Sequence, residues 1–459
     1  MSKDKQNEIS TSTKPVLSGV EMLSTSLEGK RVGYKETKLG WIPEDWDTPT
    51  ISEVFEFLKT TSFSREQLNY DDENETYYIH YGDIHATYKT PILDFEIIKS
   101  VPKLNSDVAL PASVQYLENG DVIIADASED YDGVGTAIEL KNIDKKKVIS
   151  GLHTFALRDR EELTVEGFRT YIFKNPIVKK ALKTIATGSK VFGISKGNVQ
   201  KFEIVLPTLP EQQKIANILN TWDKAIAAQE KLIAQKQALK KGLMQQLLTG
   251  KKRFAGFVEE WEEIRLKDLT TLITKGTTPT SLGYSFLDEG INFIKAESIS
   301  KSGFIDIDYT PKISIDCDKV LKRSRLKEND VVFSIAGTLG RTSIITKKDL
   351  PANINQALSI VRLKDKQNIE FINFCLNTNA IDKYIKAMVS VGAQPNINLQ
   401  QVGNIKLKLP CKEEQNKIVE MLKNSENDLF LAKEKKDSMQ KQKQGLMQQL
   451  LTGEKRVKA

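Results

Sequence analysis

Residues 242–250 read GLMQQLLTG, and residues 445–453 read GLMQQLLTG again. The likeness continues upstream at the same offset of 203 residues, where LPTLPEQQKIANIL at 206–219 aligns with LPCKEEQNKIVEML at 409–422. At this offset Pro207 faces Pro410 and Glu211 faces Glu414, with no insertion or deletion. One chain therefore contains the same long segment twice.

Each copy of this segment is predicted to be one long helix. Apolar residues recur at three-to-four spacing in both copies, at Ile215, Leu219, Trp222, Ile226 and Ile233 and at Ile418, Leu422 and Leu429. Pro210 suits the first turn of such a helix. From Glu211 to Leu248 the helix would measure about 57 Å at about 1.5 Å per residue. That length exceeds most single globular domains, so the helix needs a partner.

The two predicted helices are each other's natural partner. Both are rich in Lys and Gln, so neither has enough apolar surface to be stable alone, whereas two copies can share one seam. We expect an antiparallel pair in a pseudo-two-fold repeat; the alternative is that each helix packs only on its neighbouring domain. Gly242 and Gly445 lie inside these helices, and they cost stability unless they permit a kink or a close backbone approach.

The segments between the helices repeat loosely. LGWIPEDW at 39–46 resembles FAGFVEEW at 254–261, LENGDVIIADAS at 117–128 resembles LKENDVVFSIAG at 326–337, and GSKVFGISKGNV at 188–199 parallels GAQPNINLQQV at 392–402. Apolar runs at 121–128, 201–207, 330–337 and 404–410 predict strands, and 371–389 predicts short helices. Each segment is therefore predicted to be a globule of the mixed α/β class.

These patterns divide the chain into five predicted parts. They are a polar N-terminal tail at 1–38, a globule at 39–207, a central long helix at 208–252, a second globule at 253–410 and a C-terminal long helix at 411–459. In the tail, LEGKRVGYKE at 27–36 faintly echoes LTGKKRFAGF at 248–257. The tail is either a worn third copy of the helix end that packs near the second helix or a disordered extension.

Composition restricts the class of protein. The net charge of +6 permits an anionic partner, and no window holds the roughly 18 apolar residues that a membrane span needs. No secretory signal is evident, so we expect a cytoplasmic protein with no membrane partner. Cys317, Cys375 and Cys411 are isolated thiols, which argues against disulfides and zinc knuckles. His80 and His85 fit surface or packing positions better than a metal site.

Motifs of catalysis are missing. The nearest approach to a phosphate-binding loop, GTLGRTS at 337–343, lacks the Gly-Lys pair, and KNPIVK at 174–179 lacks the second proline of adenine methyltransferases. Asp132, Glu139 and Lys141 imitate the spacing of a metal-dependent nuclease. We favour a structural interpretation, in which a turn at Asp132 precedes a strand that exposes Glu139 and Lys141.

The sequence resembles the specificity subunit of type I restriction-modification enzymes over nearly its whole length. The resemblance rests on KETKLGWIPEDW at 35–46, LPTLPEQQKIANIL at 206–219, both GLMQQLLTG copies and KGTTP at 275–279. It implies two target-recognition domains separated by two similar helices, with no catalysis in this chain. It also implies that the helices act as a ruler between DNA half-sites about 34 to 36 Å apart.

The resemblance also implies partners and cofactors. Two similar helices would dock two methyltransferase subunits with approximate two-fold symmetry, and restriction (motor-nuclease) subunits would complete the complex on double-stranded DNA. S-adenosylmethionine, ATP and magnesium would belong to those partners, and none to this chain. We therefore expect a non-catalytic subunit that reads a bipartite, asymmetric target for adenine-N6 methylation. The rivals are an enzyme with its own site at Asp132, Glu139 and Lys141, and a coiled-coil scaffold without a DNA role.

Candidate DNA contacts lie in polar loops beside apolar strands. In the first globule they are Lys59, Thr60, Thr61, Ser62, Ser64, Arg65, Ser128, Tyr131, His153 and Lys190. In the second globule they are Lys275, Gly276, Thr277, Thr278, Pro279, Gly337, Arg341, Gln356, Gln394 and Asn396. Such residues would hold phosphates or read base edges, but 59–65 and 275–279 fit plain surface turns equally well. Lys251, Lys252 and Arg253 fit either a solvated helix end or a DNA-backbone contact.

Overall fold

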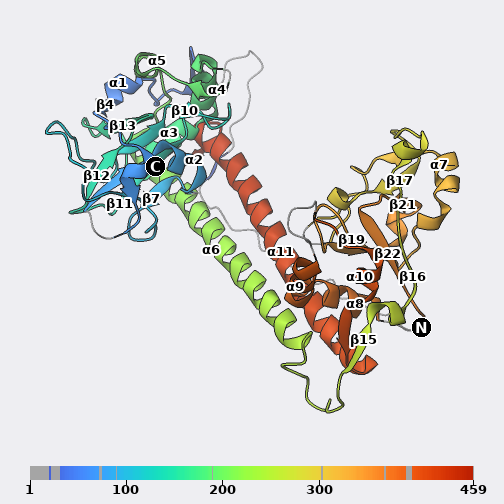
Figure 1. Cartoon of the computed structure of the whole chain (residues 1–459). Coiled ribbons are helices and arrows are strands. Elements are labelled where there is room, and N and C mark those ends of the chain that lie inside the picture. The colour runs from blue at the N-terminus through green and yellow to red at the C-terminus, as the bar shows by residue number, and fades with distance from the viewer. Residues whose placement is uncertain are drawn as a thin grey trace, which may run out of the picture. The chain divides into compact units, whose positions relative to one another are not determined.

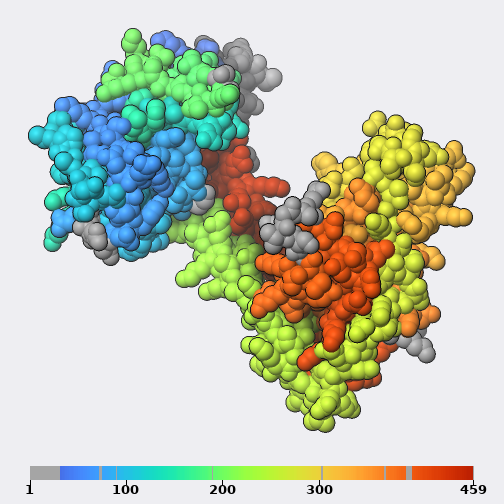
Figure 2. Space-filling model, in the orientation of Figure 1, coloured from blue at the N-terminus to red at the C-terminus, as the bar shows by residue number. Residues whose placement is uncertain are grey.

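The computed structural model describes residues 20–21, 32–71, 75–88, 90–188, 190–300, 303–365, 368–388 and 395–457. Two compact units make up the chain: unit 1 contains residues 1–229 and 435–459, and unit 2 contains residues 230–434. The long helices α6 (Leu209–Leu247) and α11 (Lys412–Leu451) each contribute one half to each unit. The globular part of unit 1 is coloured blue to green and that of unit 2 yellow to orange (Figures 1 and 2).

Unit 1 is built on two sheets. The larger sheet has the order β4 (Phe55–Leu58), β13 (Thr154–Asp159), β9 (Val122–Ala125), β11 (Ala137–Lys141) and β7 (Ile92–Asp94), and only its β11–β7 pair is parallel. The smaller sheet has the order β12 (Lys147–Ser150), β6 (Thr76–Ile79), β8 (Lys103–Leu104) and β5 (Leu68–Asn69). All four residues of β9 are buried because its alternate side chains enter two different apolar clusters.

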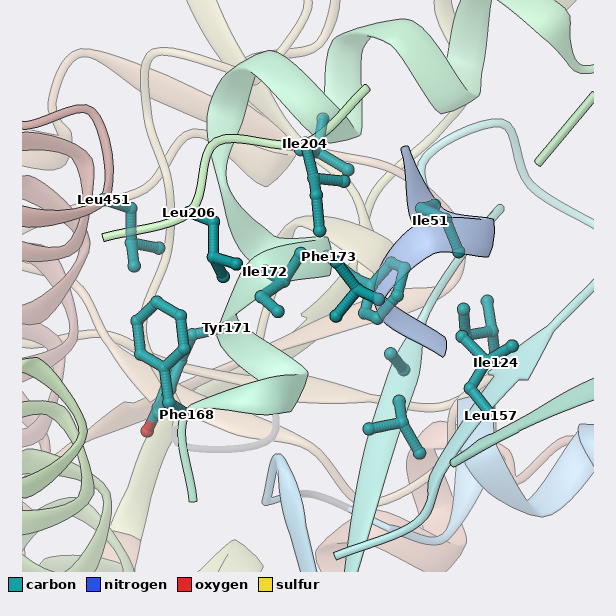
Figure 3. Close-up of a cluster of buried hydrophobic side chains, with 14 of the residues drawn as sticks. Ile51, Ile124, Leu157, Phe168, Tyr171, Ile172, Phe173, Ile204, Leu206 and Leu451 are labelled. Atoms are coloured by element: carbon teal, nitrogen blue, oxygen red, sulfur yellow. The ribbon is translucent and has the colours of Figure 1, made fainter. Parts of the chain in front are cut away.

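Helices cover one of these clusters in unit 1. They include α1 (Ile51–Val54), α3 (Arg169–Lys174), α4 (Pro176–Ile185) and α5 (Lys196–Gln200), while α2 (Tyr81–Ala86) follows β6. Figure 3 shows Phe168, Tyr171 and Ile172 in this core, together with Leu451 from the far end of α11. The start of α6 adds further buried side chains. The first core is therefore closed by both long helices.

Unit 2 repeats this plan with different details. Its sheets have the orders β16 (Thr270–Lys275), β22 (Leu358–Leu363), β19 (Val331–Ser334), β20 (Thr342–Ile344), and β18 (Lys312–Ile313), β17 (Ile291–Ile294), β21 (Ala352–Ile354). A further pair joins β15 (Glu262–Arg265) to β23 (Lys406–Leu409). The helices are α7 (Ile315–Val320), α8 (Ile369–Leu376), α9 (Asn379–Met388) and α10 (Leu399–Gly403). The core takes in the end of α6 and the start of α11.

The repeated nonapeptides are helix ends that complete these cores. Leu247 and Leu248 of the first copy are buried in unit 2, and Leu450 and Leu451 of the second copy are buried in unit 1. Both copies stop at a glycine in the left-handed region, where Gly250 has φ +70° and Gly453 has φ +72°. The first nonapeptide therefore follows the globule of unit 1 in the sequence but fills the core of unit 2. The second follows the globule of unit 2 but fills the core of unit 1.

The two long helices pair in an antiparallel direction, as expected. In unit 2 the Lys236 and Lys240 ammonium groups of α6 lie 2.7 Å from carboxylates of Asp428 and Glu426 on α11. In unit 1 Lys443 of α11 lies 2.5 Å from Asp223 of α6. Residue numbers thus rise along α6 as they fall along α11.

The two glycines inside the helices do not serve packing within the described part of the chain. A Cβ atom placed on Gly242 or on Gly445 would meet no atom within 4 Å. Both glycines lie in uninterrupted helix assignments. A close approach between the described parts of this chain therefore does not account for these glycines.

Two local predictions need correction. The predicted strand at 201–207 forms only isolated bridges, Leu206 with Asp47 and Glu203 with Thr50, because the facing segment pairs with it at single points. In the N-terminal tail, β1 (Val20–Glu21) pairs with β24 (Arg456–Val457), directly after the second nonapeptide. Residues 20–21 lie outside the echo at 27–36, whose described part contains β2 (Tyr34–Thr37), paired with β3 (Gly40–Pro43). A disordered tail is therefore wrong for these residues, whereas 1–19 and 22–31 lie outside the described residues.

Candidate nucleic-acid interface

The first turn of each long helix contains a buried glutamate, Glu211 in α6 and Glu414 in α11. Its carboxylate binds side chains from other segments of the same unit. In unit 1 Glu211 accepts hydrogen bonds from Trp46 Nε1 (2.7 Å) and from Nε and Nη2 of Arg456 (2.8 Å each). Asp45 also accepts from Arg456 Nη2, and that hydrogen bond is the main reason why the pKa of the Asp45 carboxyl is lowered. Glu211 thereby joins the start of α6, the end of α11 and the first globule.

Unit 2 contains the same arrangement. Glu414 accepts from Nε and Nη2 of Arg253 at 3.0 and 2.7 Å and from Trp261 Nε1 at 3.2 Å. Arg253 is therefore neither a free helix end nor available for a DNA phosphate, because a fully buried carboxylate holds its guanidinium. The sequence contained a signal for this ion pair, since an arginine follows each nonapeptide at the same offset of 203 residues that separates the two glutamates.

A second ion pair occurs in both units and shows which residues of the two larger sheets are equivalent. Arg158 of β13 binds Asp121 through Nε and Nη2 at 2.9 and 2.7 Å, and Arg362 of β22 binds Asp330 in the same way at 2.7 Å for both bonds. The two aspartates immediately precede β9 and β19. Residues of β13 therefore correspond to residues of β22 at an offset of 204.

This correspondence extends into the loops at the end of each sheet. The N–H of Asp126 donates to the carbonyl of His153 at 3.1 Å, and the N–H of Ile335 donates to the carbonyl of Ala357 at 2.8 Å. Four loops meet at this end in each unit. They form tip 1, residues 59–65, 126–131, 150–153, 187–188 and 190–193, and tip 2, residues 275–279, 335–341, 354–357 and 395–397.

A glycine permits the close packing of tip 2. A Cβ atom on Gly276 would lie 1.8 Å from the carbonyl oxygen of Ile354, so any side chain there would push two loops apart. The equivalent contact in tip 1 is a hydrogen bond from the N–H of Thr61 to the carbonyl of Ser150 at 3.0 Å. The predicted loop at 275–279 is thus held against the start of β22.

The predicted residues of the first globule all lie in tip 1, but not all are accessible. Lys59, Thr60, Ser62, Ser64, Arg65, Tyr131, His153 and Lys190 are exposed, and Thr61 is half-buried. Ser128 is only 2% exposed and accepts from the N–H of Asp130, so its hydroxyl is covered in this structure and its contact with a base stays a prediction. The Arg65 guanidinium binds both oxygens of Asp83, at 2.8 and 3.1 Å, and therefore supports the loop.

Tip 2 gathers most of its predicted residues. Lys275, Gly337, Gln356 and Asn396 are exposed, Thr277, Thr278 and Arg341 are half-buried, and Gly276 and Pro279 are buried and shape the loop. The guanidinium of Arg341 donates to the carbonyl of Ile299 at 2.6 Å, which ties a neighbouring loop to the tip. Gln394 lies outside the described residues.

The nuclease-like trio is not assembled. Asp132 pairs with Lys183, whereas Glu139 accepts from the N–H groups of Gly167 and Thr170. Glu139 is 2% exposed because the segment of Gly167 and Thr170 packs over its face of β11, so its predicted exposure was wrong; burial raises the pKa of its carboxyl to about 7. Lys141 is exposed. Within the ranges described, no cluster of three or more His, Cys, Asp or Glu residues is arranged to hold a metal ion.

The paired helices carry an apolar groove in unit 1. A cavity of about 690 Å³ opens between α6 and α11, with Ile218, Trp222, Ala225 and Met439 among its lining residues. At the offset of 203 residues, unit 2 has Ser425 in place of Trp222 and the paired Asp428 and Lys236 in place of Ala225 and Met439. The two helix faces are therefore alike at the nonapeptides and different along the middle of the helices.

Comparison with known proteins identifies the family. A family model described as the type I restriction modification DNA specificity domain matches residues 43–236 and 258–440. The chain belongs to this family. It is 25% identical over 452 residues to the type I restriction enzyme MjaVIII specificity subunit of Methanocaldococcus jannaschii, covering 94% of this chain and 97% of that protein. It is also 25% identical over 255 residues to the EcoBI specificity subunit of Escherichia coli, covering 49% and 52%.

Solved structures share the fold of this specificity subunit. The S subunit of a type I system from M. genitalium matches with a TM-score of 0.51 and 16% identity, covering 88% of this chain and 96% of that chain. A chain from a structure titled for complex assembly and conformational transition of the type I R-M system matches with a TM-score of 0.57 and 19% identity, covering 90% and 99%. The expected mixed α/β fold with two sheet-rich domains is confirmed.

Family membership decides between the rival functions. The chain is the DNA-specificity subunit of a type I restriction-modification complex and is non-catalytic within it. Cofactors of the complex therefore belong to partner subunits. No helix in the described ranges is long and apolar enough to cross a membrane.

Proposed function

We propose that tip 1 and tip 2 each read one half of a bipartite, asymmetric double-stranded DNA target. One observation carries this proposal: the two tips occupy the same place on matched sheets, yet they present different side chains. Equivalent placement supports a shared task, and different side chains support different half-sites. The target-recognition domains would be 39–207 and 253–410, with 208–252 and 411–459 as spacer helices and 1–38 as a tail.

Within each tip, charge and hydrogen-bonding capacity suggest separate roles. The exposed Lys59, Lys190 and Lys275 suit contacts with phosphates, which give affinity without sequence preference. His153, Gln356 and Asn396 are exposed side chains that both donate and accept hydrogen bonds, as base edges require. His153 also lies 3.4 Å from Asp126, whose carboxyl has a pKa raised by burial.

The helix pair would dock two methyltransferase subunits. The groove beside Trp222 has the apolar floor and polar rim that suit an amphipathic helix. Gly242 and Gly445 leave open space above both helices, which would let a partner backbone approach closely. S-adenosylmethionine would be carried by the methyltransferase subunits for adenine-N6 transfer, and ATP and magnesium would serve the restriction subunits. Such a complex would act in the cytoplasm.

The helices would also set the distance between half-sites. The 39 residues of α6 correspond to about 58 Å at about 1.5 Å per residue, more than the roughly 34 to 36 Å of one DNA turn. An added helical turn in both α6 and α11 should therefore lengthen the spacer of the methylated target. It should leave the two half-sites unchanged, because base contacts remain within the tips.

A domain exchange tests the reading function. Residues 262–402 would be replaced by the matching part of a relative with a known target, and methylated adenines would be mapped by sequencing DNA from cells that express the subunit with its methyltransferase. We expect one half of the target to change and the other to persist. An exchange limited to α7 would serve as the control and should change neither half. If the full exchange altered both halves or neither, the two tips would not read DNA independently.

A further inference from the structure

Leu152 and Gln356 occupy equivalent positions in the two tips. The paired Arg158 and Arg362 set the offset of 204 residues, and the matched backbone bonds to His153 and Ala357 extend it to the loops. Leu152 and Gln356 directly precede those two residues. Leu152 is 49% exposed and Gln356 is exposed. The same place in the fold therefore carries an apolar side chain in one tip and an amide in the other.

The amide of Gln356 is oriented by its neighbour. The hydroxyl of Thr278 donates to Gln356 Oε1, which identifies the oxygen end of the amide and leaves one of its lone pairs free. In the described part of the chain, no hydrogen bond occupies Gln356 Nε2. An amide with an accepting oxygen and a donating nitrogen matches the N6 and N7 edge of adenine in the major groove.

The backbone of Leu152 is hydrogen-bonded to a buried tyrosine. Its N–H donates to the hydroxyl of Tyr78 at 3.2 Å, and the ring of Tyr78 packs edge-on against Phe63 with centroids 5.7 Å apart. The Tyr78 ring is itself buried, so the Leu152 side chain, which is 49% exposed, is the apolar group that this corner of tip 1 offers to the 5-methyl group of a thymine.

We propose that this pair of positions sets a base preference in each half-site. Gln356 reads the N6 and N7 edge of an adenine in the half-site of tip 2, with Thr278 as the positioning residue. Leu152 contacts the 5-methyl group of a thymine in the half-site of tip 1. The inference rests on the proposed reading function of the tips and deepens it, because it names a chemical group for each half.

The test uses base analogues that remove one atom or one methyl group. Duplexes carrying the methylation-mapped target would contain 7-deazaadenine for adenine, or uracil for thymine, in one half-site at a time. Binding would be measured with the subunit assembled with its methyltransferase. We expect 7-deazaadenine in the tip 2 half to weaken binding on the order of 2- to 10-fold, as for one lost hydrogen bond, because the N6 amino group remains. Uracil in the tip 1 half should weaken binding about fourfold, as for one lost buried methyl group.

Variants of Gln356 and Leu152 would show whether these residues cause the losses of affinity with the two base analogues. Gln356→Leu should abolish sensitivity to 7-deazaadenine, and Leu152→Ala should abolish sensitivity to uracil, while each leaves the other half-site unaffected. Thr278→Val should reduce the 7-deazaadenine effect without abolishing it. Leu163→Ala, at a leucine that is 38% exposed and outside tip 1, is the matched control and should keep both sensitivities.

The outcomes separate the two levels of inference. If the wild-type complex loses affinity with an analogue and the matching variant loses just as much, another residue reads that group and the assignment is wrong. If the wild-type complex is insensitive to both analogues yet prefers its target over a scrambled duplex, the tips recognise DNA by other contacts. If no target preference depends on either tip, the proposed reading function itself fails.

Discussion

Arg456 and Glu211 are 245 residues apart in the chain and form a two-bond ion pair, with Nε and Nη2 each 2.8 Å from a carboxylate oxygen. The Glu211 side chain is only 2% exposed, so loss of Arg456 would leave a buried carboxylate without its ion-pair partner. Arg253 and Glu414 repeat the pair in unit 2. Each compact unit is therefore closed by the end of a helix that begins in the other unit.

Removal of Arg456 should destabilise unit 1. Arg456→Ala leaves the buried Glu211 without a countercharge, and we expect a loss of about 2 to 3 kcal/mol in the free energy of unfolding, less than for a fully buried pair because the arginine is partly exposed. Chemical denaturation would measure the loss. Glu454→Ala, at an exposed neighbour, should change stability by no more than about 0.5 kcal/mol. Equal effects of the two variants would contradict this role for the ion pair.

Alanine in place of the helix glycines should stabilise the free subunit but weaken its binding to the methyltransferase. Gly242→Ala and Gly445→Ala should each raise the stability of the free subunit by roughly 0.5 to 1 kcal/mol, because each added methyl meets open space within the chain. Both should weaken methyltransferase binding, measured by titration calorimetry, since the methyl would obstruct a docked backbone. Gly197→Ala, also in open space on a helix, should not weaken binding. Unchanged binding by both helix variants would exclude a close approach at these glycines.

The apolar groove should make the two methyltransferase sites unequal. Trp222→Ser installs the residue found at the equivalent position 425, and it should weaken one site by about 2 kcal/mol, roughly 30-fold, as expected for a buried aromatic anchor. Sedimentation or native mass spectrometry should then show complexes with one methyltransferase subunit at concentrations where the wild type holds two. Ser425→Ala is the control. Loss of both subunits, or of neither, would argue against docking in this groove.

Glu139 should make the stability of unit 1 depend on pH. Its folded pKa is raised from 4.5 to about 7, mainly by burial, so the folded state retains a proton that the unfolded state releases. Stability should therefore be greatest below about pH 4.5 and fall by about 3 kcal/mol as pH rises through 7, at about 1.4 kcal/mol per pKa unit. Denaturation of Glu139→Gln across the same range should lack this slope. A slope shared by both proteins would assign the effect to another group.

Much of the candidate site was predictable because local chemistry marks loops. Gly276 and Pro279 are predicted to form a loop after an apolar strand, and residues 276–278 do follow β16 without regular structure; their contact with DNA stays a prediction. Burial was less predictable, because it depends on neighbours distant in the sequence. Ser128 and Glu139 look solvent-facing in their own segments, yet a facing loop covers the first and the segment of Gly167 and Thr170 covers the second. The run at 201–207 alternates like a strand, but its partner segment offers only single bridges.

The sequence by itself determined the repeat, the two long helices, their need for each other and the mixed α/β class of both globules. These follow from local periodicity and from an identical offset, which no distant contact can alter. Only the tertiary structure decided that the leucines of each nonapeptide leave the globule that precedes them in the sequence and fill the core around the other globule, that Arg253 and Arg456 bind buried glutamates, and that Leu152 and Gln356 share one position. Such pairings join residues more than a hundred positions apart in the sequence. They depend on which surfaces come together once the two long helices pair antiparallel, and local sequence patterns do not encode this.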